Sequence, residues 1–161
     1  PEEPFMRGEK IKKFLDRNHV HYETITHTPS FTAQGTAHSA HISGKEVVKT
    51  VILKVRDEMV MIALPANYKL NMDHMRNIFG THEVELAHEE EFRDIFPDCE
   101  VGAMPPFGDL YGIDVFVADE LTKDREIAFN AGTHTELIKL SFSDYDKLEH
   151  PRIIQLSSVL E

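Results

Sequence analysis

Residues 47–55 form the sequence Val-Val-Lys-Thr-Val-Ile-Leu-Lys-Val, which places a lysine in the middle of an apolar strand pattern. In an extended strand, Lys49 shares one face with Val47, Val51 and Leu53, so its neighbours on that face are all apolar. Taking an ammonium group out of water costs several kcal/mol unless it is paired. Two interpretations stay open on these residues alone. Lys49 is either a structural lysine, at a sheet edge or in a core ion pair, or a functional lysine that faces a cleft.

Residues 102–108, Gly-Ala-Met-Pro-Pro-Phe-Gly, are the second segment that could do chemistry. The two prolines remove two backbone donors, so the segment cannot be a regular helix or strand. Glycine allows a backbone to approach a ligand closely, and backbone N–H groups can stabilise a developing oxyanion. A plain surface crossover between two elements is the simpler interpretation of these residues taken alone.

Ten histidines raise the question of a metal site. His82-Glu83 followed by His88 lacks the i, i+4 spacing that puts two imidazoles on one helical face. His38 and His41 have helical spacing, but no Asp, Glu or Cys follows them at ligand spacing. We therefore expect no structural metal and no cofactor, while weak metal binding by the His-rich segment stays open.

Other catalytic signatures are missing. The chain has no G-x-S-x-G elbow, no P-loop and no G-x-G-x-x-G segment, so nothing in the sequence supports a serine hydrolase elbow, an NTPase or a Rossmann site. Cys99 lies between two carboxylates, which disfavour the reactive thiolate. As the only cysteine among 161 residues, it also excludes an intramolecular disulfide.

Length and charge limit the class of protein. A chain of 161 residues with 41% hydrophobic residues predicts one globular domain, 1–161. No apolar run approaches the ~18 residues of a membrane span, so we expect a cytoplasmic protein without a membrane partner. The net charge of −11 is uneven. Residues 83–100 carry eight carboxylates against one arginine, whereas residues 7–17 are basic, so a local nucleic-acid surface remains compatible with an acidic total.

Hydrophobic periodicity predicts the elements that must position these residues. Strands and helices mix without strict β-α-β alternation, which predicts an α+β fold: a mainly antiparallel or mixed sheet with flanking helices. We expect helices over 8–18, from Thr32 to 40, from Asn71 to Gly80, before Pro97 and from Ser143 onward, and strands at 20–24, 47–55, 59–64, 113–117, 126–129 and 137–140.

Three segments taken together resemble one known family. Val47-Val48-Lys49-Thr50-Val51, then 102–108, then Asn130-Ala131-Gly132-Thr133-His134 are similar in order and spacing to the YbaK/ProX family. That family comprises trans-editing aminoacyl-tRNA deacylases related to the editing insertion of bacterial prolyl-tRNA synthetases. The similarity spans most of the chain, from the opening helix to the closing Ser-x-x-Asp segment.

The resemblance implies that the chain hydrolyses the ester of mischarged aminoacyl-tRNA, with tRNA(Pro) as the first candidate. It implies contact with the tRNA acceptor end and an association with an aminoacyl-tRNA synthetase. Lys49 would be the catalytic or orienting cation, and the backbone from Gly102 to Pro106 would hold the carbonyl and the water. The substrate-binding candidates are Tyr22, Phe31, Thr50, Ala103, Met104, Gly132 and His134. The candidate tRNA-binding residues, on one face of the first helix, are Lys10, Lys13 and Arg17.

Two alternatives belong to other classes. A catalytically idle tRNA- or synthetase-binding module on the same fold is the first, and the retention of Lys49 and of the whole 102–108 segment argues against it. A metal-dependent hydrolase that uses the histidines is the second, and it would lose activity to a chelator.

Overall fold

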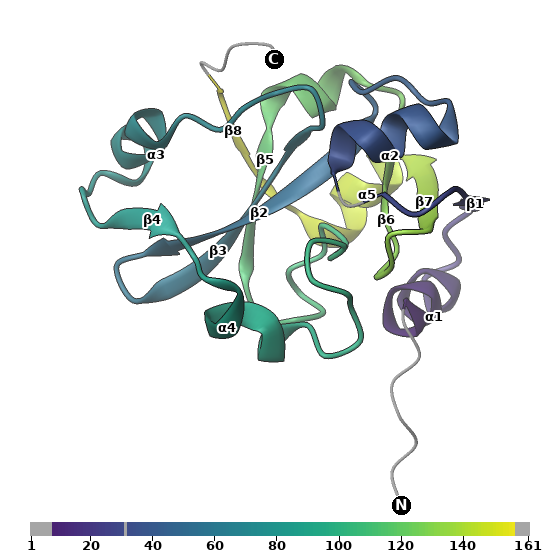
Figure 1. Cartoon of the computed structure of the whole chain (residues 1–161), viewed down its shortest axis with the longest axis horizontal. Helices are drawn as coiled ribbons and strands as arrows, with labels where there is room; N and C mark the ends of the chain where they lie inside the picture. The colour runs from purple at the N-terminus through teal and green to yellow at the C-terminus, as the bar shows by residue number, and fades with distance from the viewer. Residues whose placement is uncertain (1–7, 31, 157–161) are drawn as a thin grey trace, which may run out of the picture.

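The computed structural model describes residues 8–30 and 32–156, which combine helices with one mixed sheet (Figure 1). This is the predicted α+β class. In chain order the elements are α1 (Glu9–Arg17), β1 (Glu23–Thr26), α2 (Ala33–Ala40), β2 (Val47–Val55), β3 (Glu58–Pro65), α3 (Met72–Phe79), β4 (Val84–Leu86), α4 (Glu89–Phe92), the 3₁₀ helix η1 (Arg93–Ile95), β5 (Asp114–Ala118), the 3₁₀ helix η2 (Asp119–Lys123), β6 (Glu126–Asn130), β7 (Glu136–Ser141), α5 (Phe142–Glu149) and β8 (Arg152–Ile154).

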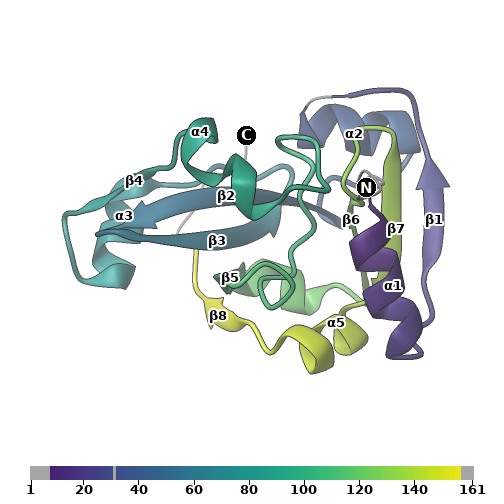
Figure 2. The same cartoon turned by 90° about the horizontal axis from the view of Figure 1, so that it is seen from below.

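The sheet has the strand order β1-β7-β6-β2-β3-β5-β8, and β4 pairs with β2. The predicted hairpin of 47–55 with the following apolar run is confirmed, because β2 and β3 pair antiparallel with Lys49 opposite Leu64. Three pairs are parallel, namely β2 with β6, β3 with β5 and β5 with β8. Figure 2 shows β1 and β7 turned steeply against β2 and β3, so the sheet is strongly curved.

One edge of β2 is shared by two partners. Its first residues, Val47 and Val48, pair with β6, whereas residues 53–55 pair with β4. The stretch 49–51 lies between these pairings, so its edge faces neither strand. This interruption opens the sheet beside Lys49.

Several predicted helix ends are confirmed. The side chains of Thr32 and Asn71 accept hydrogen bonds from the backbone N–H groups of Gly35 and His74, as N-caps do, and Gly80 ends α3 in a left-handed conformation. The closing helix differs from the prediction. Its N-cap is Ser141, whose hydroxyl accepts from the Asp144 N–H at 3.1 Å, so α5 begins before the predicted Ser143.

Other boundaries also differ. The first strand begins at Glu23 rather than at residue 20, and the helix before Pro97 is one turn of α-helix followed by η1. The sequence patterns did not predict β4 and β8, which have three residues each. Such short strands hold too few residues to display a period of two.

The main core cluster anchors the 102–108 segment. Phe107 is fully buried, and its ring contacts Phe14, Phe129 and Tyr145 with centroid separations of 5.9, 5.6 and 5.0 Å. Residues 103–108 are all buried, so this segment is an interior loop and not a plain surface crossover. No helix within the described ranges is long and apolar enough to cross a membrane.

Candidate active site

A cavity of about 210 Å³ lies at the interrupted edge of β2. It is bounded by the start of β2, the beginning of the 102–108 loop, the end of β6 and the turn that follows β6. Its lining residues are Thr32, Val48, Lys49, Thr50, Gly102, Met104, Asn130 and His134. We call this cavity the Lys49 pocket.

β2 positions Lys49 and Thr50 in the pocket wall. Lys49 is half-buried between the fully enclosed positions Val47 and Val48 and the core residue Ile52. The Thr50 hydroxyl donates to the Met104 carbonyl at 3.2 Å and thereby ties β2 to the loop. The strand and the loop therefore line the same pocket and are joined by a hydrogen bond.

Gly102 has a backbone conformation that favours glycine, with φ of +84°. A Cβ atom there would lie 3.4 Å from Cε1 of His134, inside the pocket. The Gly102 N–H contacts the thioether sulfur of Met104 at 3.3 Å. Sulfur is a weak acceptor, so this N–H can be taken over by a stronger acceptor such as a carbonyl oxygen of a bound ligand.

His134 joins two walls of the pocket. Its Nδ1 lies 3.0 Å from the Ser30 carbonyl oxygen and its Nε2 lies 2.8 Å from the Val101 carbonyl oxygen. A neutral imidazole donates from one nitrogen only, so both contacts are hydrogen bonds only when the ring is doubly protonated. The backbone N–H of His134 also donates to Oε1 of Glu100 at 2.8 Å. The turn after β6 is thereby fixed to the segment that precedes Gly102.

Comparison with known proteins identifies the family. The profile of the aminoacyl-tRNA editing domain matches residues 27–148, which include every residue of the Lys49 pocket. The chain belongs to the aminoacyl-tRNA editing domain family. The resemblance drawn from the three sequence segments is confirmed at this level.

Two curated relatives of the editing domain are proline–tRNA ligases. The chain is 35% identical over 106 residues to a proline–tRNA ligase of Macrococcus caseolyticus, covering 65% of this chain and 18% of that protein. It is 32% identical over 79 residues to the corresponding ligase of Bacillus cytotoxicus, covering 49% and 14%. The chain thus spans less than a fifth of the length of these curated relatives.

Solved structures share the fold. A protein proposed to be a trans-editing enzyme for prolyl tRNA synthetase superposes with a TM-score of 0.77 at 16% identity, covering 92% of this chain and 95% of that one. A hypothetical protein superposes with a TM-score of 0.80 at 21% identity, covering 94% and 100%. At these identities the likeness establishes the fold alone.

The structure brings some of the predicted site residues of the editing domain together and separates others. Lys49, Thr50, Gly102, Met104 and His134 all line the Lys49 pocket. Three further predicted residues do not line the pocket. They are Ala103, whose carbonyl accepts from the Gly132 N–H, Gly132 itself, and Pro106.

One further predicted substrate-binding residue of the described part of the chain is not found at the pocket. Tyr22 precedes β1, and its hydroxyl donates to Asp16 at 3.0 Å, so the structure places it beside the end of α1. Phe31 lies outside the described residues.

Sequence reasoning missed Thr32, Val48 and Asn130 as lining residues. Asn130 is 8% exposed, and its Oδ1 has no hydrogen-bond partner within the described part of the chain. The sequence could have indicated Asn130 through its position in the Asn-Ala-Gly-Thr-His segment. Burying a polar side chain without a hydrogen-bond partner at the end of a strand costs free energy, so such a residue is a candidate for binding a ligand.

α5 supports the loop from the opposite side. The Tyr145 hydroxyl donates to the Pro106 carbonyl at 2.7 Å, and the buried Glu149 carboxyl accepts from the backbone N–H groups of Gly108 and Asp109. Burial first, and the neighbouring carboxylate of Asp109 second, raises the pKa of Glu149 to about 8. Asp114, His150 and Arg152 line the small cavity beside this carboxyl.

We expect the stability of the domain to fall as the pH rises from about 5 to about 8. The folded chain keeps a proton on Glu149 that the unfolded chain, with an ordinary carboxyl pKa near 4.5, has already released. The contribution of Glu149 to stability is therefore complete below the unfolded-state pKa of about 4.5, and it is lost as the pH rises through the folded-state pKa of about 8. Urea unfolding at several pH values measures this slope.

Glu149→Gln should flatten that slope, because the amide does not titrate. Glu126→Gln, a control at an exposed strand position paired with Lys139, should keep the parental slope. Equal slopes for Glu149→Gln and the parent would contradict the assignment of the proton to Glu149.

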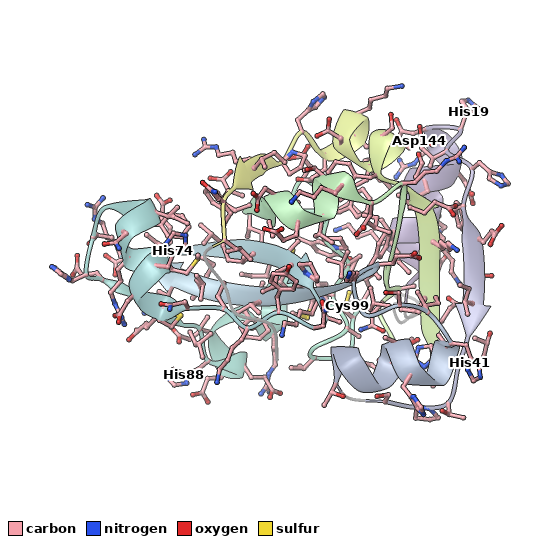
Figure 3. The ribbon with its side chains drawn as sticks, turned by 90° about the horizontal axis from the view of Figure 1, so that it is seen from above. His19, His41, His74, His88, Cys99 and Asp144 are labelled. Carbon is pink, nitrogen blue, oxygen red and sulfur yellow. The ribbon has the colours of Figure 1, made fainter. Side chains whose placement is uncertain are left out.

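The structure places the histidines on several different elements. Figure 3 shows His19, His41, His74 and His88 at separate places on the molecule. Among the residues that the structure describes, no group of three or more His, Cys, Asp or Glu side chains could hold a metal ion.

Proposed function

We propose that this editing domain hydrolyses the ester that joins a wrongly attached amino acid to the 3′ end of a tRNA. The observation that carries the proposal is the Lys49 pocket, where the half-buried lysine of β2 and the left-handed backbone of Gly102 share one small cavity. Both groups suit a reaction in which negative charge develops on a carbonyl oxygen.

The size of the pocket suits the aminoacyl group. Its volume of about 210 Å³ is below the ~300–1,000 Å³ of sites for drug-sized ligands, which leaves room for an amino acid but not for a nucleoside in addition. Val48 and Met104 contribute apolar wall, so a small side chain fits better than a charged one.

The proposed reaction needs an oriented water and no protein nucleophile. A water oxygen adds to the ester carbonyl carbon, and the carbonyl oxygen takes up the charge. The Lys49 ammonium and the Gly102 N–H stabilise that oxygen. The C–O bond to the ribose then breaks, the amino acid leaves as its acid, and the ribose oxygen takes the remaining proton of the water. Holding water and ester together supplies much of the rate gain.

The substrate class follows from the family. The curated relatives are proline–tRNA ligases, so tRNA(Pro) carrying the wrong amino acid is the first candidate. We further propose that residues 1–161 act as one domain that binds the acceptor end of the tRNA, in association with an aminoacyl-tRNA synthetase.

A panel of charged tRNAs tests this function. Ala-, Cys-, Ser- and Thr-tRNA(Pro) are incubated with the protein beside correctly charged Pro-tRNA(Pro). We expect faster deacylation of at least one mischarged species, with Pro-tRNA(Pro) spared. If the protein binds tRNA but deacylates none of these species, the proposed activity is wrong and the protein is a tRNA-binding module.

Basic side chains of α1 are the proposed contact for tRNA phosphates. Lys13 and Arg17 are exposed, and the Lys10 ammonium lies 4.6 Å from the centre of the Tyr111 ring. Lys13 also pairs with Glu9, but this exposed i, i+4 pair contributes little and can exchange for a phosphate.

Replacing Lys10, Lys13 and Arg17 together by Gln should weaken tRNA binding and flatten its salt dependence. Each lost phosphate contact lowers the slope of log K against log salt by ~0.7–0.9. The single-turnover rate of saturated substrate should stay near the parental value. A control that replaces the exposed Lys69, Lys123 and Lys147 by Gln removes the same charge elsewhere. Identical slopes for the two triple variants would exclude α1 as the phosphate contact.

A further inference from the structure

Helix α5 contacts the far end of the loop that lines the Lys49 pocket. The Tyr145 hydroxyl donates to the Pro106 carbonyl at 2.7 Å. One turn later on the same face of the helix, the Glu149 carboxyl accepts from the backbone N–H groups of Gly108 and Asp109. Tyr145 and Glu149 are both buried, so these attachments lie inside the molecule. α5 therefore holds the middle and the end of the loop together.

The loop is stiff between α5 and the pocket. Its two prolines fix two φ angles, and Phe107, which follows them, is fully buried among aromatic rings. At the other end, the Met104 carbonyl accepts from the Thr50 hydroxyl at 3.2 Å. The loop is thus attached to β2 at the pocket and to α5 behind it. Few rotatable backbone bonds separate the two attachments, so a movement at the α5 end displaces the backbone that lines the pocket.

The Glu149 carboxyl keeps unused hydrogen-bonding capacity in the interior. The residue is 7% exposed, and its Oε1 has no hydrogen-bond partner within the described part of the chain. It lies at a cavity of about 80 Å³ between the end of the loop, β5, α5 and β8. Tyr145 is the titratable neighbour on α5 itself. The other charged and titratable groups around the cavity are Asp109, Asp114, His150 and Arg152.

These surroundings favour the neutral form of Glu149. Burial and then the carboxylate of Asp109 raise its pKa to about 8, and the two backbone N–H groups only partly oppose this shift. The Arg152 guanidinium lies 5.6 Å from the centre of the Phe116 ring. Ionisation of Glu149 therefore places a second carboxylate charge beside Asp109, directly at the end of the loop.

We propose that Glu149 is a positioning residue for deacylation, whose neutral carboxyl holds the loop in place and whose ionised form releases it. The inference rests on the proposed function for the role of the loop at the ester. On ionisation the carboxylate turns into the cavity, where water can solvate it, and the N–H groups of Gly108 and Asp109 lose their acceptor. Deacylation is thereby coupled to a proton outside the Lys49 pocket.

The pH dependence of single-turnover deacylation tests this coupling. Each parental rate is divided by the rate of Glu149→Gln at the same pH, which removes the general rise of ester hydrolysis with hydroxide. Glutamine accepts from the same N–H groups but does not ionise, whereas a carboxyl with a pKa of about 8 is about nine-tenths ionised at about pH 9. We expect a ratio near the value of about one at about pH 6.5 and a fall of at least about threefold at about pH 9.

Glu126→Gln is the matched control, because Glu126 is an exposed carboxyl on β6 that pairs with Lys139. Its rates, divided in the same way, should fall as the parental rates do. A parental ratio that stays constant over this pH range would overturn the inference, since a merely structural Glu149 moves no pH profile.

The α-carbon resonance of Gly102 gives a second measurement that needs no catalysis. In protein labelled with ¹³C-glycine, we expect this resonance to shift with an inflection near the Glu149 pKa of about 8 in the parent and in Glu126→Gln. Glu149→Gln should lack that inflection. Gly80, which ends α3 away from α5 in Figures 1 and 2, is the internal control and should not follow it.

The two measurements separate failure of this inference from failure of the proposed function. Absence of the inflection at Gly102 in the parent, or its persistence in Glu149→Gln, would contradict the coupling. If no member of the charged-tRNA panel is deacylated, the proposed function fails, and the Gly102 resonance alone decides whether Glu149 controls the loop.

Discussion

Lys49→Met is expected to lower the single-turnover rate of deacylation by about 10²–10³ with little change in melting temperature. Removing one preorganised group that stabilises an oxyanion typically costs this factor. Methionine keeps an unbranched apolar stem of similar length, so the packing of the half-buried side chain beside Val48 and Ile52 is retained. Deacylation of a mischarged tRNA and circular dichroism melting measure the two quantities.

Lys54→Met provides the matched control for this prediction. Lys54 lies on the same strand, but its ammonium pairs with Glu91 at 3.0 Å, away from the Lys49 pocket. Its replacement should leave the rate near the parental value. If Lys49→Met stays fully active and melts several degrees lower, Lys49 is a structural residue and the site assignment is wrong.

Gly102→Val is expected to lower the rate by about 10–100-fold while Lys49 stays in place. The left-handed conformation at φ +84° disfavours any side chain by ~1–2 kcal/mol, and the new atoms would enter the pocket toward His134. The loop backbone could then no longer approach an ester. Single-turnover deacylation measures the loss.

Gly112→Val separates backbone strain from obstruction of the pocket. Gly112 has φ +73°, and a Cβ there would meet nothing within 4 Å. This variant should lose stability to a similar degree but keep its rate. Equal rate losses in both glycine variants would mean that strain, and not occupation of the pocket, explains the effect of Gly102→Val.

The fold was predictable where a local pattern determines the structure. The apolar run with β-branched residues gave the β2–β3 hairpin, and the side chains of Thr32 and Asn71 marked two helix starts. The pairing of β2 with both β6 and β4 depends on contacts between distant segments. The hydrophobic pattern of β2 alone therefore cannot indicate that its edge is interrupted beside Lys49.

The same limit explains which site residues were predicted. Lys49 and Gly102 are unusual in their own segments, a lysine in an apolar strand and a glycine before two prolines, so the sequence alone draws attention to them. Asn130 and Thr32 reach the pocket only because the end of β6 and the start of α2 meet there. Tyr22 was assigned to the pocket from the family resemblance, but its hydroxyl binds Asp16 instead.

The double variant Lys49→Met/Gly102→Val tests most directly the central claim that the lysine and the loop act on one ester in one pocket. Groups that stabilise the same transition state are not additive when both are removed. We expect the double variant to deacylate the preferred mischarged tRNA at a rate close to that of the slower single variant. A rate loss equal to the product of the two single losses would contradict a shared site and would require Lys49 and Gly102 to act independently.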